Sequence, residues 1–310
     1  MAEIDLIADI GGTNARVAFR ASGAPWTKVH LRQAGDFPSL EALLDNVIAE
    51  AGTAPTRAAI AVPGPVSGDA IQLTNLPWRI ERSALGRKIG VSSIAIVNDL
   101  EAVALSLPHL TGDDAVTWRA GQETRAARVI VAPGTGLGVS ASVPYGETWT
   151  AVPSEGGHVQ AGMPRSTPER MRTLWHARPS WEDLLSGSGL LRIHRALGAE
   201  AATPAEVTAR AERGDAQALE AIGFFSELFG ACAGDMAIIF GAKGGCYIAG
   251  GVVPALGKLF DVSRFVAGFS DKGAYGDYVN AIPLRLISHP YPALVGLAAL
   301  VDASGKDLGR

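Results

Sequence analysis

The chain has 310 residues, of which 47% are hydrophobic and 19% charged, which is enough for two domains that each bury a core. Its formal net charge is −4, and the scattered lysines and arginines provide no basic surface for nucleic acid or an anionic membrane. We therefore expect a soluble protein that acts on a small substrate.

The N-terminal segment, residues 1–5, is acidic and leads directly into an apolar run, unlike the basic and hydrophobic regions of a signal peptide. A cytoplasmic protein is expected. The run at residues 4–8 predicts a strand, and a second strand is predicted at residues 15–19. The turn between them predicts a hairpin tip with free backbone N–H groups, and its sequence is Asp9-Ile10-Gly11-Gly12-Thr13-Asn14.

Polar side chains around this turn are candidates for phosphate binding. Asp9 could hold Mg²⁺ through the water shell of the ion, or it could cap the turn. Thr13 and Asn14 could donate hydrogen bonds to a phosphate. Arg16 could neutralise phosphate charge, or it could form an ordinary surface ion pair.

Strands and helices alternate through the rest of the first hundred residues. Apolar residues between Leu40 and Ile48 share one helical face, and Gly52 stands where a C-terminal cap is expected. Short apolar runs at residues 58–62 and 93–97 predict strands. This alternation is typical of an α/β sheet.

Asn98 and Asp99 follow the second of these strands and precede a predicted helix at residues 100–107. Open α/β sheets usually bind ligands at the carboxyl ends of their strands. Asp99 could accept a proton from a hydroxyl that attacks phosphorus, or it could be the N-cap of the helix, and both roles are compatible. Asn75 and Trp78 could line a pocket, although a lone tryptophan more often belongs to the core.

A second unit is predicted to begin at Thr111, with strands around residues 129–143 and at residues 149–152. Its first strands are joined by a second glycine turn, which predicts another phosphate-binding hairpin. Together the two turns indicate a duplicated architecture. The second turn has the sequence Ala132-Pro133-Gly134-Thr135-Gly136-Leu137-Gly138.

Glu155 and His158 are separated by Gly156 and Gly157, a spacing that lets both side chains converge on one polyol. One histidine and one carboxylate are too few for a metal site. Glu182 could add a further carboxylate to a sugar, although a solvated helical glutamate is the ordinary interpretation.

Residues 168–239 are predicted to be largely helical, with amphipathic helices at residues 205–213 and 216–229. The most apolar window, residues 236–256, is interpreted as a helix that leads into a buried strand rather than as a membrane span. Cys232 and Cys246 lie in apolar or glycine-rich surroundings, which favours buried thiols over a disulfide. 

A further strand is predicted at residues 246–249, followed by Gly250, Gly251 and Pro254 in a turn that leads into a helix. The chain then ends with a strand at residues 283–287 and an apolar helix at residues 293–301.

The order of five motifs resembles the bacterial ATP-dependent glucokinase family, a non-zinc hexokinase type within the actin-like ATPase superfamily. The motifs are DIGGTNAR (9–16), ND (98–99), PGTGLG (133–138), EGGH (155–158) and IAGGVVP (248–254). The resemblance covers nearly the whole chain. It implies a duplicated actin-like, ribonuclease H-like α/β fold, with a cleft between two domains.

In that fold, residues 1–109 and a C-terminal helix at residues 291–310 would form the small domain. Residues 110–290 would form the large domain, with a helical insertion. The resemblance also implies phosphoryl transfer from Mg-ATP to the 6-hydroxyl of glucose, the first step of glucose catabolism, and it favours a homodimer.

The resemblance implies the following site residues. Asn98, Asp99, Glu155, His158 and Glu182 would contact glucose, with Asp99 as the general base. The residues implied for the nucleotide and its phosphates are Asp9, Gly11, Gly12, Thr13, Asn14, Gly134, Thr135, Gly136, Gly250 and Gly251. Asp9 would also bind Mg²⁺ through water, and Gly250 and Gly251 would border the adenosine.

Some features limit these implications. Ser154 stands where the family often has glycine, and Gln160 where an acidic residue is common, so the breadth of sugar selectivity stays open. Related sugar kinases and repressors carry a cysteine-rich zinc motif after the EGGH-like element. Here Cys232 is the first cysteine after His158, so no zinc is expected.

Two alternatives remain at this stage. One is a kinase for another hexose, or one that uses ADP or polyphosphate as donor. The other is a non-catalytic ATP-dependent switch or sugar sensor, because actin-like folds also serve chaperones and filaments.

Overall fold

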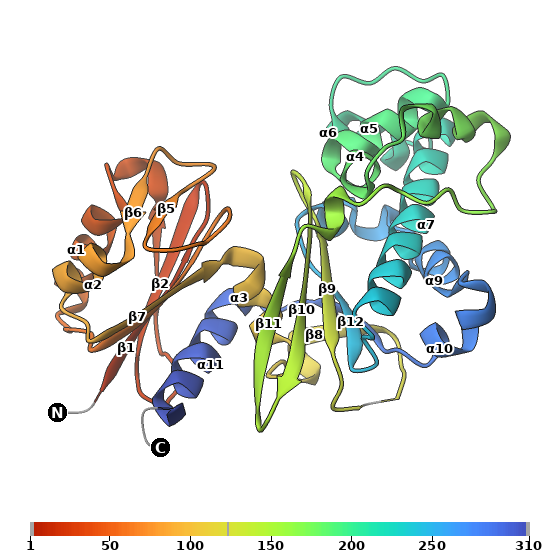
Figure 1. Ribbon diagram of the computed structural model, residues 1–310. Helices are drawn as coiled ribbons and strands as arrows, with labels where there is room; N and C mark the ends of the chain where they lie inside the picture. The colour runs from red at the N-terminus through yellow and green to blue at the C-terminus, as the bar shows by residue number, and fades with distance from the viewer. Residues whose placement is uncertain (1–2, 123, 308–310) are drawn as a thin grey trace. The chain divides into compact units, whose positions relative to one another are not determined.

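The computed structural model describes residues 3–122 and 124–307, and these form two compact units (Figure 1). Unit 1 contains residues Met1–Leu110, Tyr145–Ala151 and His289–Arg310. Unit 2 contains Thr111–Pro144 and Val152–Ser288. The chain thus leaves unit 1 and returns to it twice.

Five strands form the sheet of unit 1, in the order β3-β2-β1-β4-β7. They are β1 (Ile4–Ile10), β2 (Asn14–Ala21), β3 (Val29–Gln33), β4 (Arg57–Val62) and β7 (Ser93–Asn98). β2 is antiparallel to β1 and β3, whereas β1, β4 and β7 are parallel. The carboxyl ends of these three strands therefore meet at one edge of the sheet. A separate antiparallel pair consists of β5 (Ala70–Gln72) and β6 (Arg79–Glu81).

Helices cover both faces of this sheet (Figure 1). One face packs against α1 (Leu40–Ala51) and α2 (Arg82–Ile89), and the other against α3 (Asp99–Ser106) and α11 (Pro292–Asp307). The predicted limits of α1 are confirmed, because the Ser39 side chain caps its start and Gly52 ends it with φ of 60°. α11 is longer than its predicted core at residues 293–301.

Six strands form the second sheet, in the order β11-β10-β9-β12-β13-β8, and all of its residues belong to unit 2 except those of Tyr145–Ala151. They are β8 (Ala115–Arg119), β9 (Arg128–Pro133), β10 (Leu137–Tyr145), β11 (Thr148–Ser154), β12 (Gly245–Ile248) and β13 (Leu284–Ile287). β9 is antiparallel to β10 and parallel to β12, which is parallel to β13.

The two sheets repeat one topology. In each, a run of three consecutive strands is extended on the side of its first strand by two parallel strands, as β3-β2-β1-β4-β7 and β11-β10-β9-β12-β13 show. Each glycine turn joins the first two strands of such a run. The predicted pair of hairpins is therefore confirmed.

The helices of unit 2 pack around one long central helix, α7 (Ala216–Ile239) (Figure 1). The others are α4 (Trp181–Leu185), α5 (Gly187–Ala196), α6 (Pro204–Glu212), α8 (Val252–Leu256), α9 (Val262–Ser270) and α10 (Gly276–Asn280). By length and composition α7 could cross a membrane, but 78% of its apolar window is buried within the protein. It is a core helix of unit 2.

Candidate functional site

Asp9 and Asn98 lie at the edge of the unit 1 sheet where the parallel strands end. Asp9 is paired with Ala61 of β4, and Asn98 is paired with Val62 of the same strand. Asp99 is the first residue of α3. The strand ends thus bring together the two acidic residues that the sequence singled out, although they are far apart along the chain.

The helix cap at this edge is Asn98 rather than Asp99, which corrects the alternative role predicted for Asp99. The Asn98 side-chain oxygen accepts from the Leu100 N–H at 2.9 Å, and its Nδ2 donates to the Gly64 carbonyl at 3.1 Å. The Glu101 carboxylate accepts from the Asn98 N–H at 3.4 Å, completing a capping box. These bonds fix the backbone from which the Asp99 side chain projects.

Burial perturbs all three carboxyl groups at this edge. It raises the pKa of Asp99, although a hydrogen bond from the Leu100 N–H opposes the change. Burial also raises the pKa of Asp9, opposed by the Arg16 guanidinium and reinforced by the negative charge of Asp99. The pKa of Glu101 is raised by burial as well. A raised pKa brings a carboxylate closer to the proton affinity that a general base requires at neutral pH.

The first glycine turn lies directly after Asp9. Within the described residues, the N–H groups of Gly12 and Thr13 donate to no backbone carbonyl, so they are available to an anion. A Cβ at Gly12 would stand 2.9 Å from the Asn75 Cβ, so only glycine fits below that side chain. Arg16 Nη1 lies 3.1 Å from Asp9 Oδ2, so its alternative role as an ion pair is what the structure shows.

The second glycine turn belongs to unit 2, where it contacts the start of α5 and the third glycine motif. The Gly187 N–H at the start of α5 donates to the Gly134 carbonyl at 3.1 Å. Gly250, with φ of 83°, packs so closely on β9 that a Cβ would lie 2.3 Å from the Pro133 carbonyl oxygen. Positive φ and the close approach both require glycine there. The structure therefore places the third glycine motif against the second.

Glu155, His158 and Glu182 converge in unit 2, as the sequence predicted for the first two. His158 Nε2 lies 3.9 Å from Glu155 Oε2, and its Nδ1 lies 3.8 Å from Glu182 Oε1. The Glu155 side chain is 85% exposed and the His158 side chain 61%, so both can reach a ligand. Donors and acceptors arranged in this way suit a polyol.

The packing around Gly156 and Gly157 requires glycine at both positions. They begin a 3-10 turn, η3 (Gly156–His158), and both are buried. A Cβ at Gly157 would lie 2.0 Å from the Leu137 carbonyl oxygen. Ser154 Oγ accepts from the Gly156 N–H at 2.9 Å, so this unusual serine supports the turn itself. Gln160 forms an isolated bridge with Ser180.

A family model described as glucokinase matches residues 6–304 of this chain. The chain belongs to the glucokinase family. The resemblance seen in the five motifs is thereby confirmed, and so is the actin-like fold that it implies.

The sequences of individual glucokinases match nearly the whole length of this chain. The glucokinase of Nitrobacter hamburgensis is 40% identical over 316 residues, which cover 97% of this chain and 98% of that protein. That of Chromobacterium violaceum is 39% identical over 309 residues, covering 95% and 88%. The crystal structure of a glucokinase from an Antarctic psychrotroph superposes with a TM-score of 0.89 at 28% identity, covering 98% and 100%.

Two contacts of the candidate site, one made by Glu101 and one made by Glu182, were not anticipated from the sequence. Glu101 holds the Asn98 backbone, and its signal was present as an Asn-x-x-Glu capping pattern at the start of a helix. Glu182 accepts a hydrogen bond from the Leu137 N–H at 2.8 Å. Nothing in the spacing of Leu137 and Glu182 along the chain indicates that bond.

The residues present fit Mg²⁺ that arrives with a nucleotide. Asp9 offers hard carboxylate oxygens, and its side chain is 17% exposed beside a turn with free N–H groups. No group of three metal-binding side chains gathers within residues 3–122 and 124–307. Asp9 would therefore share the ion with water and phosphate oxygens, as Mg²⁺ commonly does.

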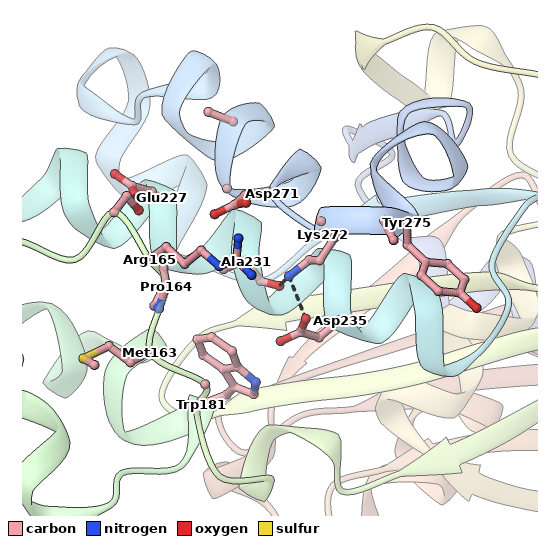
Figure 2. Close-up of a pocket in the computed structure, with 16 residues that line it drawn as sticks. Met163, Pro164, Arg165, Trp181, Glu227, Ala231, Asp235, Asp271, Lys272 and Tyr275 are labelled. Carbon is pink, nitrogen blue, oxygen red and sulfur yellow. Dashed lines mark hydrogen bonds and ion pairs between the residues drawn. The ribbon is translucent and has the colours of Figure 1, made fainter.

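Unit 2 also contains a pocket of about 630 Å³ that is lined by other residues than the candidate site residues (Figure 2). Its lining includes Arg165, Glu227 and Asp271, together with Lys272 and Asp235, whose charged groups are 2.6 Å apart. None of the predicted site residues lines this pocket. It is therefore not the place where the predicted chemistry is assembled.

The remaining candidates belong to the core. Trp78 is 3% exposed and packs among the residues of unit 1, as its alternative interpretation held. Cys232 and Cys246 are free and buried, which confirms the prediction of buried thiols. Burial raises the pKa of Cys246 to about 12, so this thiol stays protonated.

Proposed function

We propose that this protein transfers the γ-phosphoryl group of Mg-ATP to the 6-hydroxyl of glucose, giving glucose 6-phosphate and ADP. This would be the first step of glucose catabolism. The observation that carries the proposal is the pair of part-buried carboxyl groups, Asp9 and Asp99, beside a turn with free N–H groups. Membership of the glucokinase family supports the same reaction.

The candidate site residues have different roles toward the sugar. Asp99 accepts the proton of the 6-hydroxyl as that oxygen attacks phosphorus, and Asn98 and Glu101 hold it in position. Asn98, Glu155, His158 and Glu182 bind the sugar hydroxyls. Phosphoryl transfer asks for little covalent chemistry from the protein, so positioning and charge stabilisation provide most of the acceleration.

The three glycine motifs hold the nucleotide. Backbone N–H groups of the two hairpin turns bind its phosphates, and Gly250 and Gly251 border the adenosine. Thr13 and Asn14 add donors at the first turn. Asp9 would hold the Mg²⁺ of Mg-ATP through the water shell of the ion, and the ion would neutralise phosphate charge.

Asp99→Asn tests the role of the base. We expect the variant to bind glucose normally and to lose about two orders of magnitude or more in kcat, the usual scale of general acid–base catalysis. Asp45→Asn is a matched control, since the Asp45 side chain is 47% exposed on α1 and pairs with Lys88. Near-normal turnover by a folded Asp99→Asn protein would remove Asp99 from this role.

The acceptor and donor are tested by initial rates with Mg-ATP across glucose, mannose, fructose, glucosamine and N-acetylglucosamine. ADP and polyphosphate serve as alternative donors, and one reaction contains no sugar. Preference for glucose with ATP supports the proposal. Preference for another sugar or donor keeps the mechanism and changes the substrate, whereas ATP turnover without sugar favours an ATP-dependent switch.

We also propose that units 1 and 2 are the small and large domains of the kinase, and that it acts as a cytoplasmic homodimer without zinc. The family resemblance supports the dimer, and the composition supports the compartment. Sedimentation equilibrium across a concentration series tests the dimer, and elemental analysis of the purified protein tests for zinc.

A further inference from the structure

Glu182 contacts both the second glycine turn and the imidazole of His158. Its Oε2 accepts a hydrogen bond from the Leu137 N–H at 2.8 Å, and its Oε1 lies 3.8 Å from His158 Nδ1. The side chain is 34% exposed, so a ligand can reach it. A single carboxylate thus connects the residues proposed for sugar with the turn proposed for phosphate.

The contact with the turn is close and specific. A Cβ at Gly136 would lie 2.4 Å from Glu182 Oε2, so the carboxylate occupies the space that a side chain there would need. Within the described residues, Glu182 is the one side chain that hydrogen-bonds residues 133–138. The other contacts of the turn come from backbone, including the Gly134 N–H to the Gly136 carbonyl.

The backbone of Glu182 is held in place by α4. It lies in the first turn of α4, where Ser180 and Asp183 form a capping box with hydrogen bonds of 2.9 and 3.1 Å. α4 also packs within the core of unit 2 through Trp181, Leu184 and Leu185. The remaining freedom of Glu182 is therefore rotation of its own side chain.

We propose that Glu182 couples sugar binding to nucleotide binding. By holding the Leu137 N–H, it orders the turn whose remaining N–H groups, those of Thr135 and Gly136, would bind phosphate. The inference rests on the proposed function. A sugar hydroxyl bonded to Oε1 restricts side-chain rotation and keeps Oε2 on the Leu137 N–H. The turn is then held in its anion-binding form before the phosphates arrive, which reduces the ordering cost of nucleotide binding.

Calorimetry with the magnesium complex of AMP-PNP, a nucleotide that is not hydrolysed, tests the coupling. Kd is measured without sugar and with glucose at a concentration that saturates the protein under study. In the wild type we expect glucose to tighten nucleotide binding about five-fold or more, the usual range for linked sites. In Glu182→Ala the ratio of the two Kd values should fall close to one. Glu182→Gln should retain part of the ratio, because its amide oxygen can still accept from Leu137.

Glu155→Gln is the matched control. Glu155 Oε2 lies 3.9 Å from Nε2 of the same imidazole, and among the residues that the structure describes no hydrogen bond joins the Glu155 side chain to the turn. This variant should bind glucose more weakly and keep the wild-type ratio. Amide hydrogen exchange gives a local measurement, since glucose should slow exchange at Leu137 in the wild type and in Glu155→Gln but not in Glu182→Ala.

Three outcomes would overturn the coupling role. They are an unchanged ratio in Glu182→Ala, an equal loss of the ratio in Glu155→Gln, and a ratio of one in the wild type. Failure of the proposed function is seen separately, as a wild-type protein that does not phosphorylate glucose. A wild type that phosphorylates glucose while Glu182→Ala keeps its ratio rejects the coupling alone.

Discussion

His194 is a buried histidine with no hydrogen bond to either ring nitrogen within the described residues. It lies in α5, within unit 2. Burial lowers its pKa, and the nearby Arg210 lowers it further, whereas Asp215 and Glu206 act in the opposite direction. The folded protein therefore keeps this imidazole neutral at a pH where an unfolded chain would protonate it.

This difference predicts that acid destabilises unit 2 through His194. Below a pH of about 6.5 the unfolded chain binds a proton that the folded protein does not, so stability rises with pH and is lost as pH falls. The maximum contribution is about 1.4 kcal/mol per pH unit. Urea unfolding between pH 5 and pH 7.5 should show a shallower decline for His194→Leu than for the wild type.

The matched control is His176→Gln, which removes an exposed histidine of η4 (Glu169–Ala177). It controls for the loss of a histidine as such. An identical decline in His194→Leu and the wild type would assign the acid sensitivity to other groups.

At the scale of residues, the sequence located the candidate site better than it described the bonds within it. Asp9, Asn98 and Asp99 could be predicted because they follow apolar runs, where strands end. Their local roles could not, since the choice between Asn98 and Asp99 as N-cap depends on backbone angles near φ of −66° and ψ of 151° at Asn98. The bond between Glu182 and Leu137 arises only when distant segments pack together.

At the scale of elements, α7 and α9 cross unusually closely because glycines line their contact. A Cβ at Gly230 would lie 1.9 Å from the Phe265 carbonyl oxygen, and one at Gly268 would lie 2.2 Å from that of Glu227. Gly234 likewise packs on the Phe269 carbonyl oxygen, at 2.6 Å. The two backbones therefore leave no room for a methyl group at these positions.

Gly268→Ala should destabilise the protein by about 2 kcal/mol or more. Alanine favours a helix over glycine by roughly 1 kcal/mol, but the forced separation of packed helices costs more than this gain. Chemical denaturation gives the free energy of unfolding. Gly276→Ala, at the start of α10, has its nearest contact at 3.8 Å and should be neutral or slightly stabilising. Equal stability of Gly268→Ala and the wild type would contradict the packing argument.

The same burial explains why the sequence shows an amphipathic pattern over only the first part of α7. The amphipathic pattern of α7 ends near Phe229, yet the helix continues to Ile239. Beyond Phe229 several sides of the helix are buried, including Cys232 and Met236, so the polar face that marks amphipathicity largely disappears. By contrast, α1 keeps both its apolar stripe and its caps, and its limits were predictable.

At the scale of the whole molecule, a buried ionic network fastens the C-terminal helix to the first strand of unit 1. Asp5 in β1 is fully buried, with Arg57 Nη2 at 2.7 Å and Arg20 Nη2 at 3.1 Å. Arg20 also donates to the Ala298 carbonyl and pairs with Asp302, both in α11. One buried carboxylate therefore pairs with guanidinium groups from β2 and β4, and Arg20 extends the network to α11.

Asp5→Asn should lower the free energy of unfolding by about 3 kcal/mol, because it removes the fully buried counter-ion that Arg20 and Arg57 share. The side chain keeps its size, so the loss reports charge rather than a cavity. Urea denaturation followed by circular dichroism measures it. Asp45→Asn, which breaks the exposed pair with Lys88, should change stability by less than about 1 kcal/mol. Similar losses in both variants would argue against the network.

Because α11 packs against the unit 1 sheet, one face of that sheet is covered late in synthesis. Ribosomal synthesis proceeds from the N-terminus, so β1 and β4 emerge long before the helix that covers Ile7, Ala59 and Ala61. All of unit 2, residues 111–144 and 152–288, emerges before that helix too. The face of the unit 1 sheet that α11 covers is therefore open to aggregation until residues 292–307 have been synthesised.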